Sequence, residues 1–456
     1  MIKSKYKPYP KYKPSGVEWI GEIPEGWETN DFKFIFKYQT GGTPRSSNRS
    51  FYEGDLIWVT IADLGKRQIF SSKECLNTKG VQEANIPISL KGSLLISFKL
   101  SPGIVSFAGA DLYTNEAIAT ILPTDRLVDL NYWYYVFQNY FVLNANENIY
   151  GAKLFNQRAI KNSILSLPPL PEQKAIAAFL DRETERINGI IAKQTRMIEL
   201  LKEKRSALIT QAVTKGLSGL VSRTDADFAE WAKPVEYKPS GVEWIGDIPE
   251  GWEVRRFRFS VRYNLKTLSD GNTSPNYEIE YLDIGNVDRE GKIISTEKML
   301  FCDAPSRARR IAVNDNTIIS TVRTYLKAIA YLSDVPDNLI VSTGFAVVSC
   351  NANSVSKFFY YLFRSEYFIQ NVERNSKGVG YPAITPSQSP SNLADIQLTL
   401  PPLAEQKAIA SFLDRETVKI NTMVGKIQKQ IELLNEYKQS LITHAVTGKI
   451  DVRGEV

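Results

Sequence analysis

Histidine is almost absent from this 456-residue chain, which contains only His444. HNH nucleases and histidine-rich metal sites need several imidazoles that converge on one point. We therefore expect neither kind of site. The remaining composition, with 43% hydrophobic and 23% charged residues, is that of an ordinary globular protein.

Cysteine is scarce as well, and long apolar runs are missing. Cys75, Cys302 and Cys350 lie far apart, without the even number of a disulfide framework or the spacing of metal ligands. No apolar stretch approaches the roughly 20 residues of a membrane span, and the basic N-terminus lacks the apolar segment of a signal peptide. We therefore expect a cytoplasmic protein that makes no membrane contact.

The sequence also lacks the motifs of common nucleotide and methyl-transfer chemistry. It has no glycine-rich loop ending in Gly-Lys-Ser/Thr, so it should not itself hydrolyse ATP. Gly378-Val-Gly380 lacks the third glycine of a dinucleotide site. The Pro-Pro pairs follow leucine, not the Asn or Asp that amino-methylating enzymes place there. We expect no catalytic residues, no bound metal and no cofactor.

What the chain does contain is an internal duplication. Residues 12–28 read YKPSGVEWIGEIPEGWE, and residues 237–253 repeat them 225 positions later with one change. Residues 167–184 read LPPLPEQKAIAAFLDRET, and residues 400–417 repeat them 233 positions later with two changes. The middles, 29–166 and 254–399, have little obvious similarity. A recent duplication with one decaying copy is an alternative, but two divergent inserts in one fixed frame explain the near-identical frames better.

The repeated segments after the Pro-Pro pairs have a helical pattern. Proline and a glutamate suit the first turn, and Gly216 and Gly448 suit the ends. The apolar positions alternate steps of four and three, as in a coiled coil. Two separate core helices would be the alternative to a helix pair. The predicted seam residues are Ile176, Leu180, Ile187, Met197, Leu201, Ile409, Leu413, Ile420, Ile427 and Leu434.

The order of the segments predicts how the two helices are paired. The first helix ends close to where the second insert begins, and that insert leads into the second helix. The second helix should therefore run antiparallel to the first and end beside residues 12–28. The fold class is then α+β, with two globular mixed α/β domains joined by two long antiparallel helices in a pseudo-twofold duplication.

The two inserts carry the whole excess of positive charge. Residues 29–166 contain 14 basic and 11 acidic side chains, and residues 254–399 contain 17 and 14, so each insert is about +3 and the chain is +6. This bias fits contact with the phosphates of DNA, although solvated faces can produce it too. The candidate DNA-binding residues are loop cations, namely Arg45, Arg49, Lys99, Lys153, Arg307, Arg309, Arg310, Arg323 and Lys377.

The pattern resembles the specificity subunits of type I restriction-modification systems over nearly the whole chain. The resemblance rests on the paired Leu-Pro-Pro-Leu-x-Glu-Gln-Lys-Ala-Ile-Ala helix openings and the paired Ser-Gly-Val-Glu-Trp-Ile-Gly-x-Ile-Pro-Glu-Gly-Trp segments. It also rests on the Gly41-Gly-Thr-Pro44 loop that leads to Gly54-Asp-Leu-Ile-Trp-Val-Thr-Ile-Ala-Asp-Leu64. The second insert has no Gly-Gly-Thr-Pro match.

The resemblance implies a function. Each insert would be a target recognition domain that reads one half of a split DNA sequence, and the helices would set the spacing of the halves. The partners would be double-stranded DNA, two methyltransferase (modification) subunits and ATP-dependent restriction subunits that translocate DNA. The implied division is 1–166, an arm with the first recognition domain; 167–216, the first helix; 217–399, a linker, arm and second recognition domain; and 400–456, the second helix.

Three other functions are compatible with parts of the pattern. A stand-alone DNA-binding regulator could use the same two domains without enzymatic partners. A self-contained modification enzyme would need the methyl-transfer motifs that the sequence lacks. A coiled-coil scaffold would show no DNA affinity and no salt dependence of binding.

Overall fold

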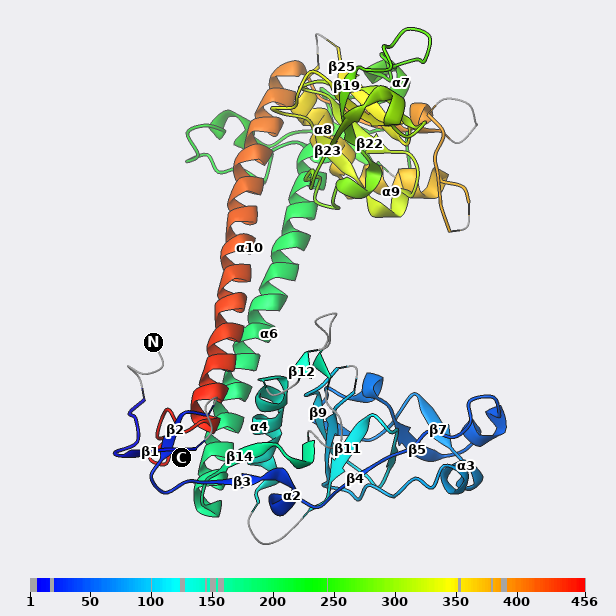
Figure 1. Ribbon diagram of the computed structural model, residues 1–456. Helices are drawn as coiled ribbons and strands as arrows, with labels where there is room; N and C mark the ends of the chain where they lie inside the picture. The colour runs from blue at the N-terminus through cyan, green and yellow to red at the C-terminus, as the bar shows by residue number, and fades with distance from the viewer. Residues whose placement is uncertain are drawn as a thin grey trace. The chain divides into compact units, whose positions relative to one another are not determined.

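The computed structural model describes residues 6–16, 20–99, 101–123, 128–143, 146–147, 153–154, 160–243, 245–351, 354–378, 380–386 and 392–455. The chain divides into two compact units, Met1–Gln194 with Lys429–Val456, and Thr195–Gln428 (Figure 1). Two long helices, α6 (Leu170–Lys215) and α10 (Leu403–Val446), each contribute one end to each unit. No helix in the described part of the chain is long and apolar enough to cross a bilayer.

The first unit contains a five-stranded sheet in the order β4-β11-β8-β9-β6 and a three-stranded sheet in the order β10-β5-β7. Their strands are β4 (Tyr38–Thr40), β5 (Leu56–Val59), β6 (Gln68–Ile69), β7 (Glu74–Leu76), β8 (Leu94–Ser97), β9 (Val105–Ala108), β10 (Tyr113–Thr114) and β11 (Ile118–Ile121). Every residue of β8, β9 and β11 is buried, so these strands form the centre of the domain.

Shorter pairs of strands and further helices belong to the described part of the first unit. The strand pairs are β1 (Tyr12–Pro14) with β2 (Glu22–Pro24), β3 (Glu28–Asp31) with β14 (Ile164–Leu167), and β12 (Asn146–Glu147) with β13 (Lys153–Leu154). The helices are α2 (Phe32–Ile35), α3 (Thr78–Glu83) and α4 (Leu130–Leu143).

The second unit has two four-stranded sheets, in the orders β18-β25-β22-β23 and β20-β19-β24-β21. Their strands are β18 (Val261–Tyr263), β19 (Glu278–Leu282), β20 (Glu297–Leu300), β21 (Ala308–Ile311), β22 (Thr317–Ser320), β23 (Ile329–Tyr331), β24 (Leu339–Ser342) and β25 (Phe345–Cys350). The remaining elements are β15 (Tyr237–Pro239), β16 (Asp247–Pro249), β17 (Glu253–Arg256), β26 (Gln397–Leu400), α7 (Phe257–Ser260), α8 (Ser356–Arg364) and α9 (Glu366–Asn375).

The two units share a topology although their middles differ in sequence. In the first, β8 pairs with β9 and β11, and β11 pairs with β4, all antiparallel. In the second, β22 pairs with β23 and β25, and β25 pairs with β18, again antiparallel. A parallel pair recurs as well, β5 with β10 and β19 with β24. The predicted fold class, two mixed α/β domains in an internal duplication, is confirmed.

Within each unit, helices α6 and α10 run antiparallel, as predicted. In the first unit, Lys438 Nζ donates to Asn188 Oδ1 at 2.9 Å, and Gln194 Nε2 donates to Gln430 Oε1 at 3.0 Å. In the second unit, Arg205 Nη1 donates to Asn421 Oδ1 at 2.7 Å. Residue numbers on α10 therefore fall as those on α6 rise.

Each helix ends at a glycine in the left-handed region, Gly216 with φ +78° and Gly448 with φ +68°. A left-handed residue after the last turn is the usual helix stop, and glycine adopts it without strain. The repeated arm lies directly against each stop. Tyr12 Oη donates to Gly448 O at 3.1 Å, and Tyr237 Oη donates to Lys215 O at 3.2 Å. The predicted contact of residues 12–28 with the end of the second helix is confirmed.

The seam between the helices differs in part from the sequence pattern. The predicted seam residues Ile176, Leu180, Ile187, Ile409, Leu413 and Ile420 are buried, and Leu201, Ile427 and Leu434 are half-buried.

Met197 is a correction, because its side chain is 51% exposed. Ile191, Ile198 and Leu201 are the less exposed side chains along this stretch of α6. The prediction extended a seven-residue repeat from Ile176, where the helix also packs against the α/β domain. An α-helix drifts by about 20° per heptad from such a repeat. The position facing the other helix has therefore moved by one residue.

Candidate nucleic-acid interface

The repeated motif at the start of each long helix fastens the helix to its arm. Trp27 donates from Nε1 to Glu172, and Trp252 donates from Nε1 to Glu405, at 2.8 Å in both cases. The two indoles are buried. Burial raises the pKa of the Glu405 carboxyl, and the hydrogen bond from Trp252 offsets part of that rise. The first unit adds a bond from the Tyr9 hydroxyl to Glu172.

The glutamine that follows holds the domain itself. Gln173 Oε1 accepts from the backbone N of Asp129 at 2.9 Å, next to helix α4, and from Trp133 Nε1 at 3.2 Å. Gln406 Oε1 accepts from the backbone N of Val355 at 3.0 Å, next to helix α8. Both glutamines are buried. The same side chain therefore connects each helix to the corresponding domain.

About two turns further along each helix, an Asp and a Thr make a third connection to the domain, through the hydroxyl of one tyrosine. Asp181 accepts from the Tyr135 hydroxyl at 2.6 Å, and Asp414 accepts from the Tyr361 hydroxyl at 2.7 Å. Burial and the bond to Asp181 raise the pKa of Tyr135 to about 12. The near-identical frame thus consists largely of groups that hold the domains in place. The exposed loops, by contrast, are built from residues that differ between the copies.

In the second unit, three loop segments meet at one end of the domain. Thr321 N donates to Gly344 O at 2.7 Å, and Thr324 N donates to Pro382 O at 3.3 Å. Arg323 and Lys327 flank a short 3₁₀ turn with φ of 52° and 53°. A non-glycine residue in the left-handed region costs about 1–2 kcal/mol. Such strain is typical of functional loops.

Exposed cations and aromatic rings gather on these segments. The Arg323 guanidinium lies 5.0 Å from the centre of the Tyr381 ring. Tyr381 is 68% exposed and Tyr325 is 51% exposed. Lys377, also exposed, pairs through its backbone with Ala383 next to these rings. Two predicted contact residues, Arg323 and Lys377, therefore lie in one loop cluster, which we call the 323–381 cluster.

The arginines at 307–310 are more occupied with their own domain than the sequence pattern suggested. Arg307 pairs with Asp283 at 3.2 Å, and its side chain is 55% exposed. Arg309 pairs with Asp270 at 3.0 Å, and only 19% of its side chain is exposed. Arg310 donates to Asn264 Oδ1 at 2.8 Å, and burial lowers its pKa.

In the first unit, one cation lies on the loop that corresponds to the 323–381 cluster. Lys99 is exposed on the connection between β8 and β9. Burial alone would raise the pKa of nearby Glu116. Hydrogen bonds, chiefly from Thr43, and the positive charge of Lys99 together outweigh burial, so the pKa of Glu116 lies below its usual value. Thr43 belongs to the Gly-Gly-Thr-Pro loop, so this loop and Lys99 surround one carboxylate.

The other predicted cations of the first unit lie on different elements. Arg45 pairs with Glu83 of α3 at 3.0 Å and is 82% exposed. Arg49 pairs with Glu74 of β7 at 3.5 Å and is 75% exposed. Lys153 lies on β13, and its side chain falls outside the described residues.

Two features escaped sequence reasoning. Tyr381, after a glycine-rich stretch, and Tyr325, in a 3₁₀ turn, were not singled out, although exposed aromatic residues often stack on ligands. The structural similarity between residues 29–166 and 254–399 was also missed. Trp58-Val-Thr-Ile-Ala-Asp63 and Tyr281-Leu-Asp-Ile-Gly-Asn286 occupy the same place, a buried strand followed by a 3₁₀ turn.

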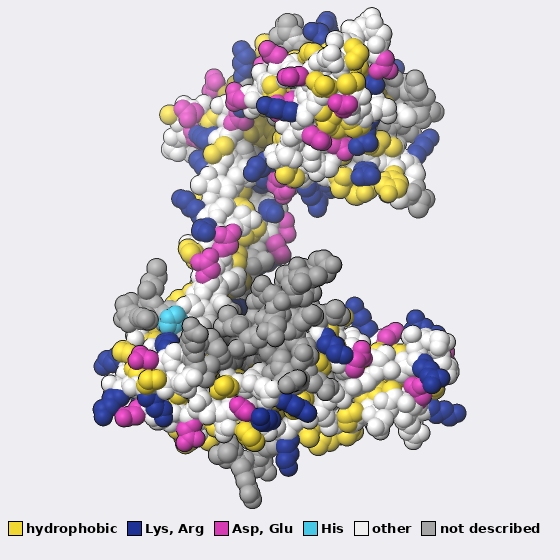
Figure 2. All heavy atoms as spheres, in the orientation of Figure 1, with side chains coloured by type: hydrophobic (Ala, Val, Ile, Leu, Met, Phe, Trp, Pro, Cys, Tyr) yellow, Lys and Arg dark blue, Asp and Glu magenta, His cyan; other side chains and the backbone are white. Residues whose placement is uncertain are grey.

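Figure 2 shows Lys and Arg spread over both units and interspersed with Asp and Glu.

The fold and these loops define a class of protein, in which two related domains with different loops are carried on one duplicated helical frame. The family model described as the Type I restriction modification DNA specificity domain matches residues 24–200 and 249–433. The chain belongs to this family. It is a specificity subunit of a type I restriction-modification system, a component that recognises and does not catalyse.

Named relatives and solved structures agree with the family. The chain is 24% identical to the type I restriction enzyme MjaIX specificity subunit of Methanocaldococcus jannaschii, over 95% of each chain. It is 22% identical to the EcoBI specificity subunit of Escherichia coli, over 74% of this chain and 69% of the other. The HsdS subunit from Thermoanaerobacter tengcongensis has a similar fold, with a TM-score of 0.51 and 16% identity over 94% and 98% of the chains.

A second solved structure, from a study of complex assembly and conformational transition of the type I R-M system, has a TM-score of 0.65. It is 15% identical and covers 93% of this chain and 98% of that chain. At these sequence identities, the two solved structures support the fold alone.

Proposed function

We propose that this specificity subunit reads a DNA target in two halves, one with each α/β domain, and that the paired helices fix the distance between the halves. The observation that supports this most is the contrast between frame and loops. The groups that fasten domain to helix recur in both units, whereas the exposed loops differ. Two readers with different loops on one frame suit an asymmetric, split target, because rigid spacing between readers makes recognition depend on half-site separation.

In this proposal, residues 1–166 and 217–399 contain the two recognition domains, and 167–216 and 400–456 are the helices with the C-terminal end. The DNA contacts are the exposed loop cations. Arg323 and Lys377 belong to the 323–381 cluster, Lys99 occupies the corresponding loop of the first domain, and Arg45, Arg49, Lys153 and Arg307 act at the phosphates. Arg309 and Arg310 would reach a phosphate only by leaving Asp270 and Asn264. Arginine donors suit the edges of guanine, and mobile lysines suit phosphates.

The partners are double-stranded DNA, two modification subunits and ATP-dependent restriction subunits. The chemistry of methyl transfer and cleavage belongs to those subunits in this proposal. The specificity subunit determines the DNA sequence at which they act, because it binds both the partner subunits and the DNA.

The experiment that tests this is selection of bound sequences from a random duplex library by the purified chain with its modification subunits. The selected sequences should share two conserved blocks with a gap of constant length. In Arg323→Gln, one block should lose its preference at one or two positions, with binding weakened about 5- to 150-fold. Lys298→Gln, at an exposed position on β20, is the matched control and should change nothing. Selection of a single uninterrupted block would contradict the proposal.

A further inference from the structure

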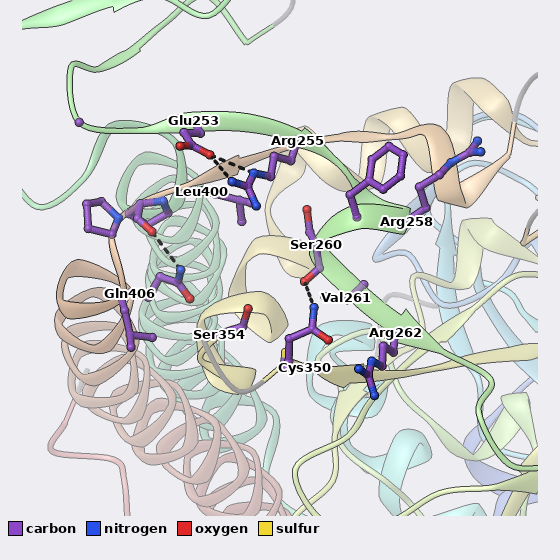
Figure 3. A pocket seen from close by; sticks show the side chains of 16 residues that line it. Glu253, Arg255, Arg258, Ser260, Val261, Arg262, Cys350, Ser354, Leu400 and Gln406 are labelled. Carbon is purple, nitrogen blue, oxygen red and sulfur yellow. Dashed lines mark hydrogen bonds and ion pairs between the residues drawn. The ribbon is translucent and has the colours of Figure 1, made fainter.

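A cleft of about 1100 Å³ opens in the second unit, away from the 323–381 cluster. Figure 3 shows Glu253 and Arg255 of β17 on one side of it, Gln406 at the start of α10 on another, and Arg262 on β18 opposite. Asn351 Nδ2 donates to Ser260 O at 3.5 Å across the bottom. The cleft is therefore built where the arm, the domain and the long helix join.

The lining combines an exposed aromatic ring with cations. Phe259 of α7 is 66% exposed, although its neighbours two positions away, Phe257 and Val261, are buried. Arg258 pairs with Asp395, whereas Arg262 has no ion pair among the described residues. Phe259, which points outward between two buried side chains, and Arg262, which has no ion pair, line the same cleft and are both available to a ligand.

The first unit repeats this surface 225 positions earlier. Phe34 of α2 is 70% exposed, between the buried Phe32 and Phe36. Lys33 and Lys37 stand where the second unit has Arg258 and Arg262, and the Lys33 ammonium lies 4.9 Å from the centre of the Phe34 ring. Only three phenylalanines in the described part of the chain are more than half exposed, and two of them are this pair.

A surface that recurs in both halves must be explained by something that both halves need. Reading of bases does not explain it, because the two domains read different sequences under the proposed function. Contact with phosphates is the same for any sequence, and the test below separates it from docking of a protein. Packing does not explain it either, because the two rings are largely exposed. A partner that binds once to each half must contact side chains that both halves carry, and the outward phenylalanine with its two flanking cations is such a set.

We propose that the surface formed by Phe259, Arg258 and Arg262, and its counterpart formed by Phe34, Lys33 and Lys37, are two equivalent docking sites for two copies of one protein. This inference rests on the proposed function, in which that protein is the modification subunit. Arg258 and Lys33 already pair with Asp395 and Asp31 of their own domains. The docking segment therefore carries acidic side chains that face Arg262 and Lys37, and an apolar side chain that packs on the ring. Aromatic and arginine side chains are the usual energetic centres of protein interfaces.

The test counts modification subunits bound by the purified chain, with native mass spectrometry, and measures their affinity. The wild-type chain should bind two. Phe34→Asp and Phe259→Asp should each bind one tightly and lose the other by about 30-fold or more. The double variant should bind none at the same concentration. Phe70→Asp is the matched control, since Phe70 is 63% exposed and lies outside both surfaces.

A second pair of variants tests the charge separately. Lys37→Glu and Arg262→Glu should weaken binding at low salt more than at high salt, because screening reduces the interaction between exposed charges. Both residues are exposed, so neither variant should lower the thermal unfolding midpoint.

Each contrary outcome points to a different failure. If the double variant still binds two subunits with unchanged affinity, the docking sites are wrong and the proposed function stands. If it keeps both subunits but loses affinity for its DNA target, the surfaces hold DNA. If the wild-type chain binds its DNA target but no modification subunit, the proposed partnership fails, and this inference with it.

Discussion

Removing one heptad from both long helices should shorten the gap in the recognised sequence and leave both half-sites unchanged. A suitable variant lacks residues 195–201 and 423–429, because it keeps the contact of Gln194 with Gln430 and that of Arg205 with Asn421. Seven residues at about 1.5 Å each shorten the helix pair by about 10 Å. At about 3.4 Å per base pair this is about 3 base pairs.

The same deletion makes a second prediction, about affinity. Three base pairs remove about 100° of DNA twist, since a turn takes about 10.5 base pairs. Seven residues change the rotation of the helix pair by only about 20°. The variant should therefore bind its shortened target more weakly than the wild-type chain binds its own, because DNA or protein must twist to bring both domains into register.

The assay is selection from random duplex DNA by the wild-type and shortened chains side by side. The control lacks 195–201 only, so its helices differ in length by seven residues and cannot place both domains as before. It should select no split motif. Altered bases within either half-site of the doubly shortened chain would refute the reasoning, because the helices would then take part in base recognition. An unchanged gap would refute it as well.

Three further predictions concern stability and side-chain reactivity. Gly448→Ala should lower stability by about 1–2 kcal/mol because its φ is +68°, whereas Gly425→Ala, in mid-helix with open space around it, should raise it by up to about 1 kcal/mol; denaturant unfolding measures both. Trp252→Phe leaves the Glu405 carboxylate without its donor and should cost about 1–3 kcal/mol at pH 8. Burial raises the pKa of Glu405, so this carboxyl favours folding at low pH and loses that contribution as pH rises through its folded pKa; the cost should shrink toward pH 4. Burial raises the pKa of Cys350 to about 11, so iodoacetamide at pH 8 should modify it on the order of 100-fold more slowly than an ordinary thiol.

The frame could be predicted from the sequence because its signals are local and appear twice. Proline before each helix and glycine after it mark the bounds that the structure shows, Leu170–Lys215 and Leu403–Val446. The order of segments was enough to predict the antiparallel pairing. The roles of the repeated Glu, Gln, Asp and Thr were not predictable, because their partners lie 40 or more residues away in the sequence.

The loop surfaces were beyond sequence reasoning for the same reason. The sequence does not distinguish a loop arginine that reaches solvent, as Arg323 does, from one that pairs with an aspartate of its own domain, as Arg309 does. No local signal in the sequence marks Phe34 and Phe259 as exposed, because large aromatic residues are usually buried. Only the turn of the backbone at α2 and α7 directs them outward between buried neighbours.

The most direct test of two-part recognition is a map of methylated bases in the genome of the source cell, with this gene intact and deleted. We expect a split motif with a fixed gap that is methylated only when the gene is present. Exchange of residues 29–166 for the corresponding insert of another specificity subunit should then change one half of the motif only. An identical map with and without the gene in cells that make the complex, or a change in both halves after the exchange, would contradict the account.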